Sequence, residues 1–259
     1  MNILLRRLYS DYLMPSRLPL YQALLEQAGQ AGYRQLSLRD YVQALRHGLA
    51  PDARLLIHRH DIDNDLRTAR RWFAIEQRLG VRASYYFRLS TLDYGFMREI
   101  EAAGSEASYH YEEIASYAKQ HHLKQAGQVR ARLPAIRRRF LRNLRRIEAG
   151  LGRPLCTVAS HGDFANRRLG LPNHLLLDDA ALRTRSGIAC EAYDRALLDS
   201  LDLYISDRPA PHYFHPLPPQ QALGRYRRIC LLTHPVQWHT NWLDSSKHNL
   251  RRLYEELAW

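Results

Sequence analysis

The chain has 259 residues, 46% of them hydrophobic and 10% aromatic, which indicates a globular protein and excludes a disordered or fibrous one. A formal net charge of +12 makes nucleic acid or an anionic membrane surface the usual candidate partners. Three widely spaced cysteines exclude a disulfide scaffold and a CxxC-type zinc site, and they fit a reducing cytosol.

The first 16 residues lack a basic stretch followed by an apolar core and a small-residue cleavage site, so they do not read as a secretory signal. No apolar run is long enough to span a bilayer. We therefore expect a cytoplasmic location.

The elements follow one another in a regular order. Residues 1–20 are expected to be a loosely structured lead-in, followed by helices over 20–32 and 36–48, the second capped by Ser37. Apolar and β-branched runs predict strands at about 54–60, 81–89, 105–113, 155–163, 201–207 and 225–238. Helical periodicity predicts helices over 66–79, 94–103, 112–122, 126–149 and 241–258, with loops at 164–175 and 208–219. This alternation favours a mostly parallel sheet with outer helices, either a barrel or an open doubly wound sheet.

Polar side chains follow five of these strands at the point where each strand ends. They occur at residues 58–63, 109–113, 160–163, 204–207 and 233–235. In parallel α/β folds these ends lie on one rim, where active sites form. Several His and Asp residues at successive strand ends are hard to explain as helix caps alone.

Asp61 and Asp63 end the strand that we expect at 54–60. Side chains alternate along a strand, so the two carboxylates should project to the same side. A cation beside them would relieve their repulsion and the cost of burying them. For this pair alone, an Asp-rich turn that caps the next helix is the more common alternative.

The residues at the rim offer the parts of a metal-assisted hydrolase. Aspartate and neutral histidine suit zinc, iron, cobalt or nickel. Asp61 or Asp63 could serve as base and ligand, His110 and His161 as ligands, and His234 as acid. Serine-hydrolase, dinucleotide-binding and P-loop motifs are absent from the sequence.

Two stretches resemble the NodB-homology polysaccharide deacetylases, a family like carbohydrate esterase family 4. HDIDND with the following LRTARRWFAIEQRLGVRASYYFRL resembles the first motif and helix–strand unit, closest to a divergent cytoplasmic branch with an HDVD motif. EASYHYEEIA, SHGD with Asn166, YISD and LLTHPVQW resemble later segments, so that the likeness covers about residues 52–240.

The resemblance implies a distorted (β/α) barrel of about seven parallel strands and a metal-dependent removal of acyl groups, usually acetyl, from N-acylated sugars or surface-polysaccharide precursors. By motif, Asp61 matches the catalytic base, Asp63 the metal-binding aspartate, His110 the first metal-binding histidine and His234 the general acid. The metal is expected to be zinc, with cobalt, nickel, iron or manganese as alternatives. The domain organisation would be a deacetylase domain over 51–259 with a helical lead-in, 1–50, packed on it.

The sequence departs from the family pattern four residues after His110. The family has a second metal-binding histidine there, whereas this chain has Ile114, which cannot ligate. His161 is our preferred substitute and Glu112 the alternative; if neither reaches the metal, the chain is a weak binder or a non-catalytic relative. Arg59, on the same strand face as Asp61, could orient the base, or it forms a simple ion pair.

The remaining assignments are substrate contacts or supporting residues. They are Arg59, Glu112, Asp163, Asn166 and Trp238, with Tyr109, Tyr111 and Trp242 as further aromatic side chains that either stack on a sugar or pack in the core. By parity, His58 and His60 face away from Asp61 and are expected to pack or to support the site from behind.

The arginine excess concentrates at residues 128–150, where Leu133, Ile136, Phe140, Leu144 and Ile147 recur at helical spacing. A solvated amphipathic helix is the preferred interpretation. The alternative function is a non-catalytic relative that binds an anionic glycan, lipid or nucleic acid through this helix. Our expected partners are a carbohydrate, sugar-nucleotide or lipid-linked substrate and a peripheral anionic membrane contact, with no specific nucleic-acid partner.

Overall fold

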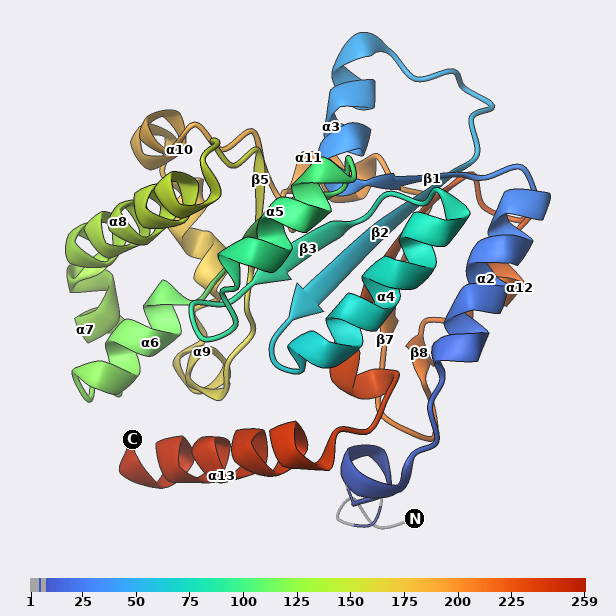
Figure 1. Ribbon diagram of the computed structural model, residues 1–259. Coiled ribbons are helices and arrows are strands. Elements are labelled where there is room, and N and C mark those ends of the chain that lie inside the picture. Colours follow the sequence, from blue (N-terminus) through green and yellow to red (C-terminus); the bar gives the residue numbers. More distant parts are fainter. Residues whose placement is uncertain (1–4, 6–7) are drawn as a thin grey trace.

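The computed structural model describes residue 5 and residues 8–259, and its centre is one curved, mostly parallel sheet (Figure 1). The strand order is β6-β5-β4-β3-β2-β9-β7-β8, with β1 paired to β2 beside this path. Every neighbouring pair is parallel except β7 and β8. The strands are β1 (Arg34–Ser37), β2 (Leu55–Ile62), β3 (Ser84–Phe87), β4 (Glu106–Tyr111), β5 (Thr157–Ser160), β6 (Cys190–Glu191), β7 (Leu203–Asp207), β8 (Phe214–His215) and β9 (Arg228–Thr233).

Helices cover the outside of the sheet and close both of its ends. They are η1 (Tyr9–Leu13), α2 (Leu18–Gln30), α3 (Leu38–His47), α4 (Leu66–Leu79), α5 (Tyr94–Ala102), α6 (Glu113–Gln120), α7 (Ala126–Ala131), α8 (Leu133–Leu151), α9 (Phe164–Leu169), η2 (Asn173–Asp178), α10 (Ala180–Ser186), α11 (Arg195–Asp199), α12 (Pro219–Ala222), η3 (Pro235–Gln237) and α13 (Trp242–Ala258). Within the described residues, no helix is both long and apolar enough to cross a bilayer.

Alternation along β2 divides the sheet into an outer and an inner face. Leu55 and Ile57 point inward, where they pack with the side chains of α3, Tyr86 and Cys230 in one buried cluster. Toward the C-terminal end of β2 the same face carries Arg59 and Asp61, both buried. The inner face of the curved sheet is therefore apolar near the N-terminal ends of the parallel strands and charged near their C-terminal ends.

The outer face of β2 carries a buried polar group of its own. His60 lies 2.7 Å from Glu76 of α4 and 2.6 Å from Thr233, and Tyr21 and Tyr85 donate hydrogen bonds to the same glutamate. These partners satisfy His60 on the side of the sheet opposite Asp61. The expectation that His60 packs behind the site is therefore confirmed.

The α/β class and the six predicted strands are confirmed, with corrections in detail. The sheet is a half-barrel of more strands than the seven expected, since β1, β6 and β8 are short and carry no clear alternation. The expected helix over 126–149 divides into α7 and α8 around Arg132, close to Pro134. The boundary at residue 50 stays a prediction, and the lead-in of residues 1–20 partly falls on 1–4 and 6–7, which lie outside the described residues.

The loop expected at 164–175 is wrong, because the segment contains α9 and the start of η2. The side chain of Asp163 accepts from the backbone of Ala165, and the side chain of Asn166 accepts from the backbone of Asp163. This capping box starts a short helix that the Gly, Pro and Asn content of the segment concealed.

Candidate functional site

Three side chains from three neighbouring strand ends meet at the charged end of the sheet. Asp63 follows β2, His110 lies in β4 and His161 follows β5. Oδ1 of Asp63 is 3.3 Å from Nε2 of His110 and 3.0 Å from Nδ1 of His161, and the two imidazole nitrogens are 3.2 Å apart. The structure thus brings together the three residues that the sequence analysis proposed as ligands, through the register of parallel strands.

The chemistry of these three atoms fits a metal ion. Nδ1 of His110 lies 2.9 Å from the carbonyl oxygen of Ala159 and must donate to it, so Nε2 of the neutral ring presents a lone pair. Oδ1 of Asp63 is buried and receives no hydrogen bond of acceptable geometry from the described residues. Lone pairs that face one another at this range require added protons or a cation. Ligands about 2.1 Å from a tetrahedral zinc stand about 3.4 Å from one another, close to the observed separations.

Electrostatics favour the charged form of Asp63. Burial alone would raise the pKa of this carboxyl, but His161 and His110 hold the pKa well below its usual range. Asp63 is therefore a carboxylate, as a metal ligand must be.

Asp61 lies beside this group and is held by Arg59. Nε and Nη2 of Arg59 donate to the two carboxylate oxygens at 2.9 and 2.8 Å, a bidentate pair with both side chains almost fully buried. Burial would raise the pKa of Asp61, but Arg59 and then His110 lower it. Arg59 is itself fixed, because it donates to Tyr204 at 3.2 Å and its guanidinium lies 4.5 Å from the ring centre of Tyr193. The expected contact between Arg59 and Asp61 is confirmed.

His234 follows β9 and is oriented by Asp207, the last residue of β7. Its Nδ1 lies 2.7 Å from Oδ1 of Asp207, and its backbone N–H donates to Oδ2. Burial would lower the pKa of His234, but Asp207 outweighs burial and raises it to about 9. At neutral pH His234 is therefore a positively charged imidazolium with a proton on Nε2.

Two of the supporting residues expected from the sequence, Glu112 and Asp163, form ion pairs. Nη2 of Arg88 donates to Glu112 at 2.6 Å, and Lys119 contacts Asp163 at 2.7 Å. These two carboxylates lie close to the far side of His161 but are already paired with cations. Glu112 does not belong to the group formed by Asp63, His110 and His161, so the geometry favours His161 over Glu112 as third ligand.

Of the two alternatives for the aromatic side chains, sugar stacking or packing in the core, three of these residues take the second. Tyr109, Tyr111 and Trp238 are at most 1% exposed, and the two tyrosines belong to the core beneath α8. Trp238 instead donates from Nε1 to Asp207 at 3.0 Å, so it supports His234 indirectly. Asn166 is likewise committed to the capping box of α9.

Sequence reasoning missed three contributors to the site. Asp207 ends a strand with a polar segment, and that signal could have paired it with His234. Asn173 donates to the backbone oxygen of His161 at 2.6 Å and accepts from the backbone of Ile114, but it sits in the segment expected to be a loop. His248 comes from α13, and nothing in the sequence connects it to residues nearly two hundred positions earlier.

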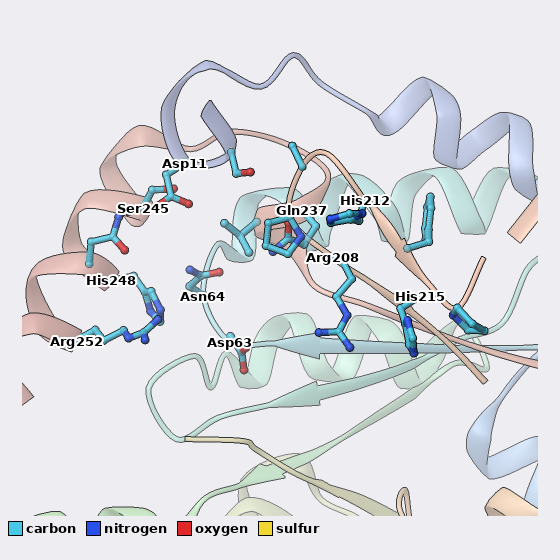
Figure 2. A pocket seen from close by; sticks show the side chains of 17 residues that line it. Asp11, Asp63, Asn64, Arg208, His212, His215, Gln237, Ser245, His248 and Arg252 are labelled. Atoms are coloured by element: carbon cyan, nitrogen blue, oxygen red, sulfur yellow. Dashed lines mark hydrogen bonds between the residues drawn. The ribbon is translucent and has the colours of Figure 1, made fainter. Parts of the chain in front are cut away.

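A cavity of about 980 Å³ opens beside Asp63 (Figure 2). One wall is α13, which contributes Ser245, His248 and Arg252. The opposite wall comes from the segment after β7, with Arg208 and His212. Asp63 therefore joins the candidate metal site to a cavity whose volume admits a sugar-sized molecule.

The arginine-rich helix α8 lies elsewhere, on the outside of the sheet with α5, α6 and α10 (Figure 1). Its predicted apolar face is buried through Ile136, Phe140, Leu144 and Ile147. Arg137 pairs with Asp179 at 2.9 Å and Arg145 with Glu148 at 2.6 Å. Part of the positive charge of the helix is therefore neutralised by ion pairs within the protein.

Comparisons with known proteins give limited similarity. No known family matches the chain, and no curated protein does. Among solved structures, the deacetylase PplD of Streptococcus pyogenes in complex with acetate is 12% identical, with a TM-score of 0.41 over 58% of this chain and 66% of that chain. A wild-type CE4 family pseudoenzyme from Bacillus anthracis is 13% identical, with a TM-score of 0.42 over 79% and 63%. A mutant of a CE4 family pseudoenzyme with restored enzymatic activity is 12% identical, with a TM-score of 0.43 over 79% and 65%.

The chain thus spans slightly less than two thirds of the length of these structures. The functional assignment therefore has to come from the side chains of this chain.

Proposed function

We propose that the protein is a metal-dependent hydrolase that removes an acyl group, acetyl in the simplest case, from an N-acylated sugar of a surface-polysaccharide precursor. The observation that carries the proposal is the convergence of Asp63, His110 and His161 at 3.0–3.3 Å. We place the reaction in the cytoplasm, which the three free cysteines support.

Asp63, His110 and His161 would hold the metal, zinc in the first place. When bound, the metal would polarise the acyl carbonyl and lower the pKa of a water molecule. Asp61 would take the proton of the attacking water, and Arg59 fixes its carboxylate in one orientation. His234, protonated because Asp207 raises its pKa, would give a proton to the amine nitrogen that leaves.

This division of work has a physical basis in the two histidine environments. Nδ1 of His110 faces a neutral carbonyl oxygen, which leaves its Nε2 free for a metal. Nδ1 of His234 faces a buried carboxylate, which stabilises the imidazolium. One histidine is thus prepared as a ligand and the other as an acid.

Metal content and acyl release together test the proposal. Purified protein, stripped and reloaded with zinc or cobalt, should hold about one ion per chain and release acetate from N-acetylated sugars or sugar nucleotides. Asp63→Asn should hold no metal and release no acetate, whereas Asp61→Asn should keep the metal and lose acetate release. Metal-loaded wild type that releases acetate from no N-acetylated monosaccharide, oligosaccharide or sugar nucleotide would overturn the assigned reaction.

A further inference from the structure

Helix α13 is amphipathic, but its polar face packs against the protein and its apolar face is exposed to solvent. Its polar side chains, among them Ser245, His248 and Arg252, face the protein and line the cavity. Its large apolar side chains point outward and are strongly exposed: Trp242 63%, Leu243 50%, Leu250 68%, Leu253 56%, Tyr254 73% and Leu257 79%. A globular protein normally buries such a stripe.

Most of the exposed apolar residues belong to two segments of the chain, which contact each other. Twelve large hydrophobic residues of the described chain are exposed, and six of them belong to α13. Four more are Leu5, Leu8, Tyr12 and Leu13, which lie within or before η1, the element that packs against α13. Tyr12 joins the two segments through hydrogen bonds with Ser246 and Asn249. We call these ten residues the apolar platform.

Basic residues lie along one edge of the apolar platform. Leu243, Leu250 and Leu257 repeat every seven residues and share one face of the helix with Leu253 and Tyr254. Lys247 and Arg251 lie on the flank of that face and are exposed. Asp244 and Glu255 share the flank of Arg251 by the same spacing but are only partly exposed, and Glu255 pairs with Arg251 at 2.9 Å and with Lys119 at 2.6 Å. Glu256 lies on the opposite flank and pairs with Arg252 at 2.8 Å.

We propose that the apolar platform docks onto an anionic lipid surface. Leucines with tryptophan and tyrosine on one face and basic residues beside them form the pattern of a helix that lies in the membrane interface. The net charge of +12 on the whole chain favours an anionic lipid surface and opposes the association of two identical chains. Because the same helix walls the cavity, docking would hold the candidate site next to the lipid headgroups (Figures 1 and 2).

Vesicle binding tests this proposal directly. We expect the full-length protein to cosediment with vesicles of phosphatidylcholine mixed with phosphatidylglycerol, more weakly with phosphatidylcholine alone, and less at high salt. The triple variant Leu250→Gln, Leu253→Gln, Leu257→Gln should bind anionic vesicles roughly a hundredfold more weakly, because three leucines no longer leave water. Lys247→Gln should weaken binding about fivefold, and its effect should vanish at high salt.

Matched controls separate docking from misfolding and from catalysis. Leu20→Gln and Leu79→Gln change two exposed leucines outside the apolar platform and should bind vesicles like the wild type. Asp63→Asn should also bind normally, so a failure of the proposed reaction would leave this result unchanged. Circular dichroism should show all variants folded.

Three outcomes would overturn the proposal. The first is wild-type protein that fails to bind anionic vesicles at low ionic strength. The second is a control leucine variant that loses as much binding as the triple variant. The third is light scattering that shows a wild-type dimer, converted to monomer by the triple variant, since the platform would then be an interface between two copies of this chain.

Discussion

Nδ1 of His234 lies 2.7 Å from Oδ1 of Asp207, and Asp207 has no exposed side-chain surface. The pair joins the ends of two neighbouring parallel strands, β7 and β9. A buried carboxylate opposite an imidazole keeps the ring positively charged well above its ordinary pKa. The first prediction follows from this pair.

We expect the activity to fall at high pH with the deprotonation of His234, at about pH 9. In the pH profile of kcat/KM, Asp207→Asn should move this fall at high pH down toward the ordinary histidine pKa of about 6.5. The contribution of the charged pair to the stability of the fold should fall over the same pH range as the activity. It is complete below about pH 6.5 and is lost as the pH rises through about 9. An NMR titration of the imidazole nitrogens measures the same pKa without any substrate.

Trp238→Phe is the matched control for this experiment. It removes the hydrogen bond to Oδ2 of Asp207 and leaves Oδ1, the atom that faces His234. The pH limb should therefore stay near 9 in this variant. A limb that moves equally in both variants, or an unshifted His234 in Asp207→Asn, would contradict the assigned pair.

The second prediction concerns removal of the metal. Chelation should lower the melting temperature of the wild type, because an ion that binds only the folded state stabilises it. Asp63→Asn should abolish the response to added zinc, because it removes the negatively charged member of the group formed with His110 and His161. The metal-free variant should itself be less stable than metal-free wild type, because a carboxyl whose pKa is lowered in the folded state stabilises the fold at neutral pH. Thermal unfolding of both proteins with and without zinc measures the effect, and an unchanged zinc response in Asp63→Asn would exclude this residue as a ligand.

The helix–strand alternation and the polar strand ends predicted the fold class and the rim that carries the site. Asp61, Asp63 and His110 could be predicted as site residues, because strand parity and parallel register follow from the sequence. The short edge strands could not be predicted, since two residues such as Cys190 and Glu191 carry no periodicity. His248 and the reversed orientation of α13 depend on where a distant helix packs, and amphipathic spacing does not reveal which face meets the protein.

The third prediction concerns the buried pair of Arg59 and Asp61. Arg59→Met should destabilise the protein by about 3–5 kcal/mol, because it leaves the carboxylate of Asp61 buried without its partner. The double variant Arg59→Met, Asp61→Asn should recover part of this loss, since no unpaired charge remains. Urea unfolding of the wild type, Arg59→Met, Asp61→Asn and the double variant gives the coupling energy. Additive losses in the double variant would show that the pair contributes only through the shape of its side chains.

The fourth prediction concerns Ile114, which stands four residues after His110, where the resembling family has a metal-binding histidine. In this structure Ile114 is fully buried within the main core cluster, so a histidine there would replace an apolar side chain of the core. We expect Ile114→His to destabilise the protein by about 3 kcal/mol or more, because it buries a polar ring among apolar side chains, and to leave zinc affinity unimproved. Gln120→His is the control, because it adds a histidine to an exposed position of the same helix and should leave stability nearly unchanged. Isothermal titration with zinc and urea unfolding measure the two effects, and a tighter zinc site in Ile114→His would show that α6, rather than the strand end at His161, supplies the third ligand.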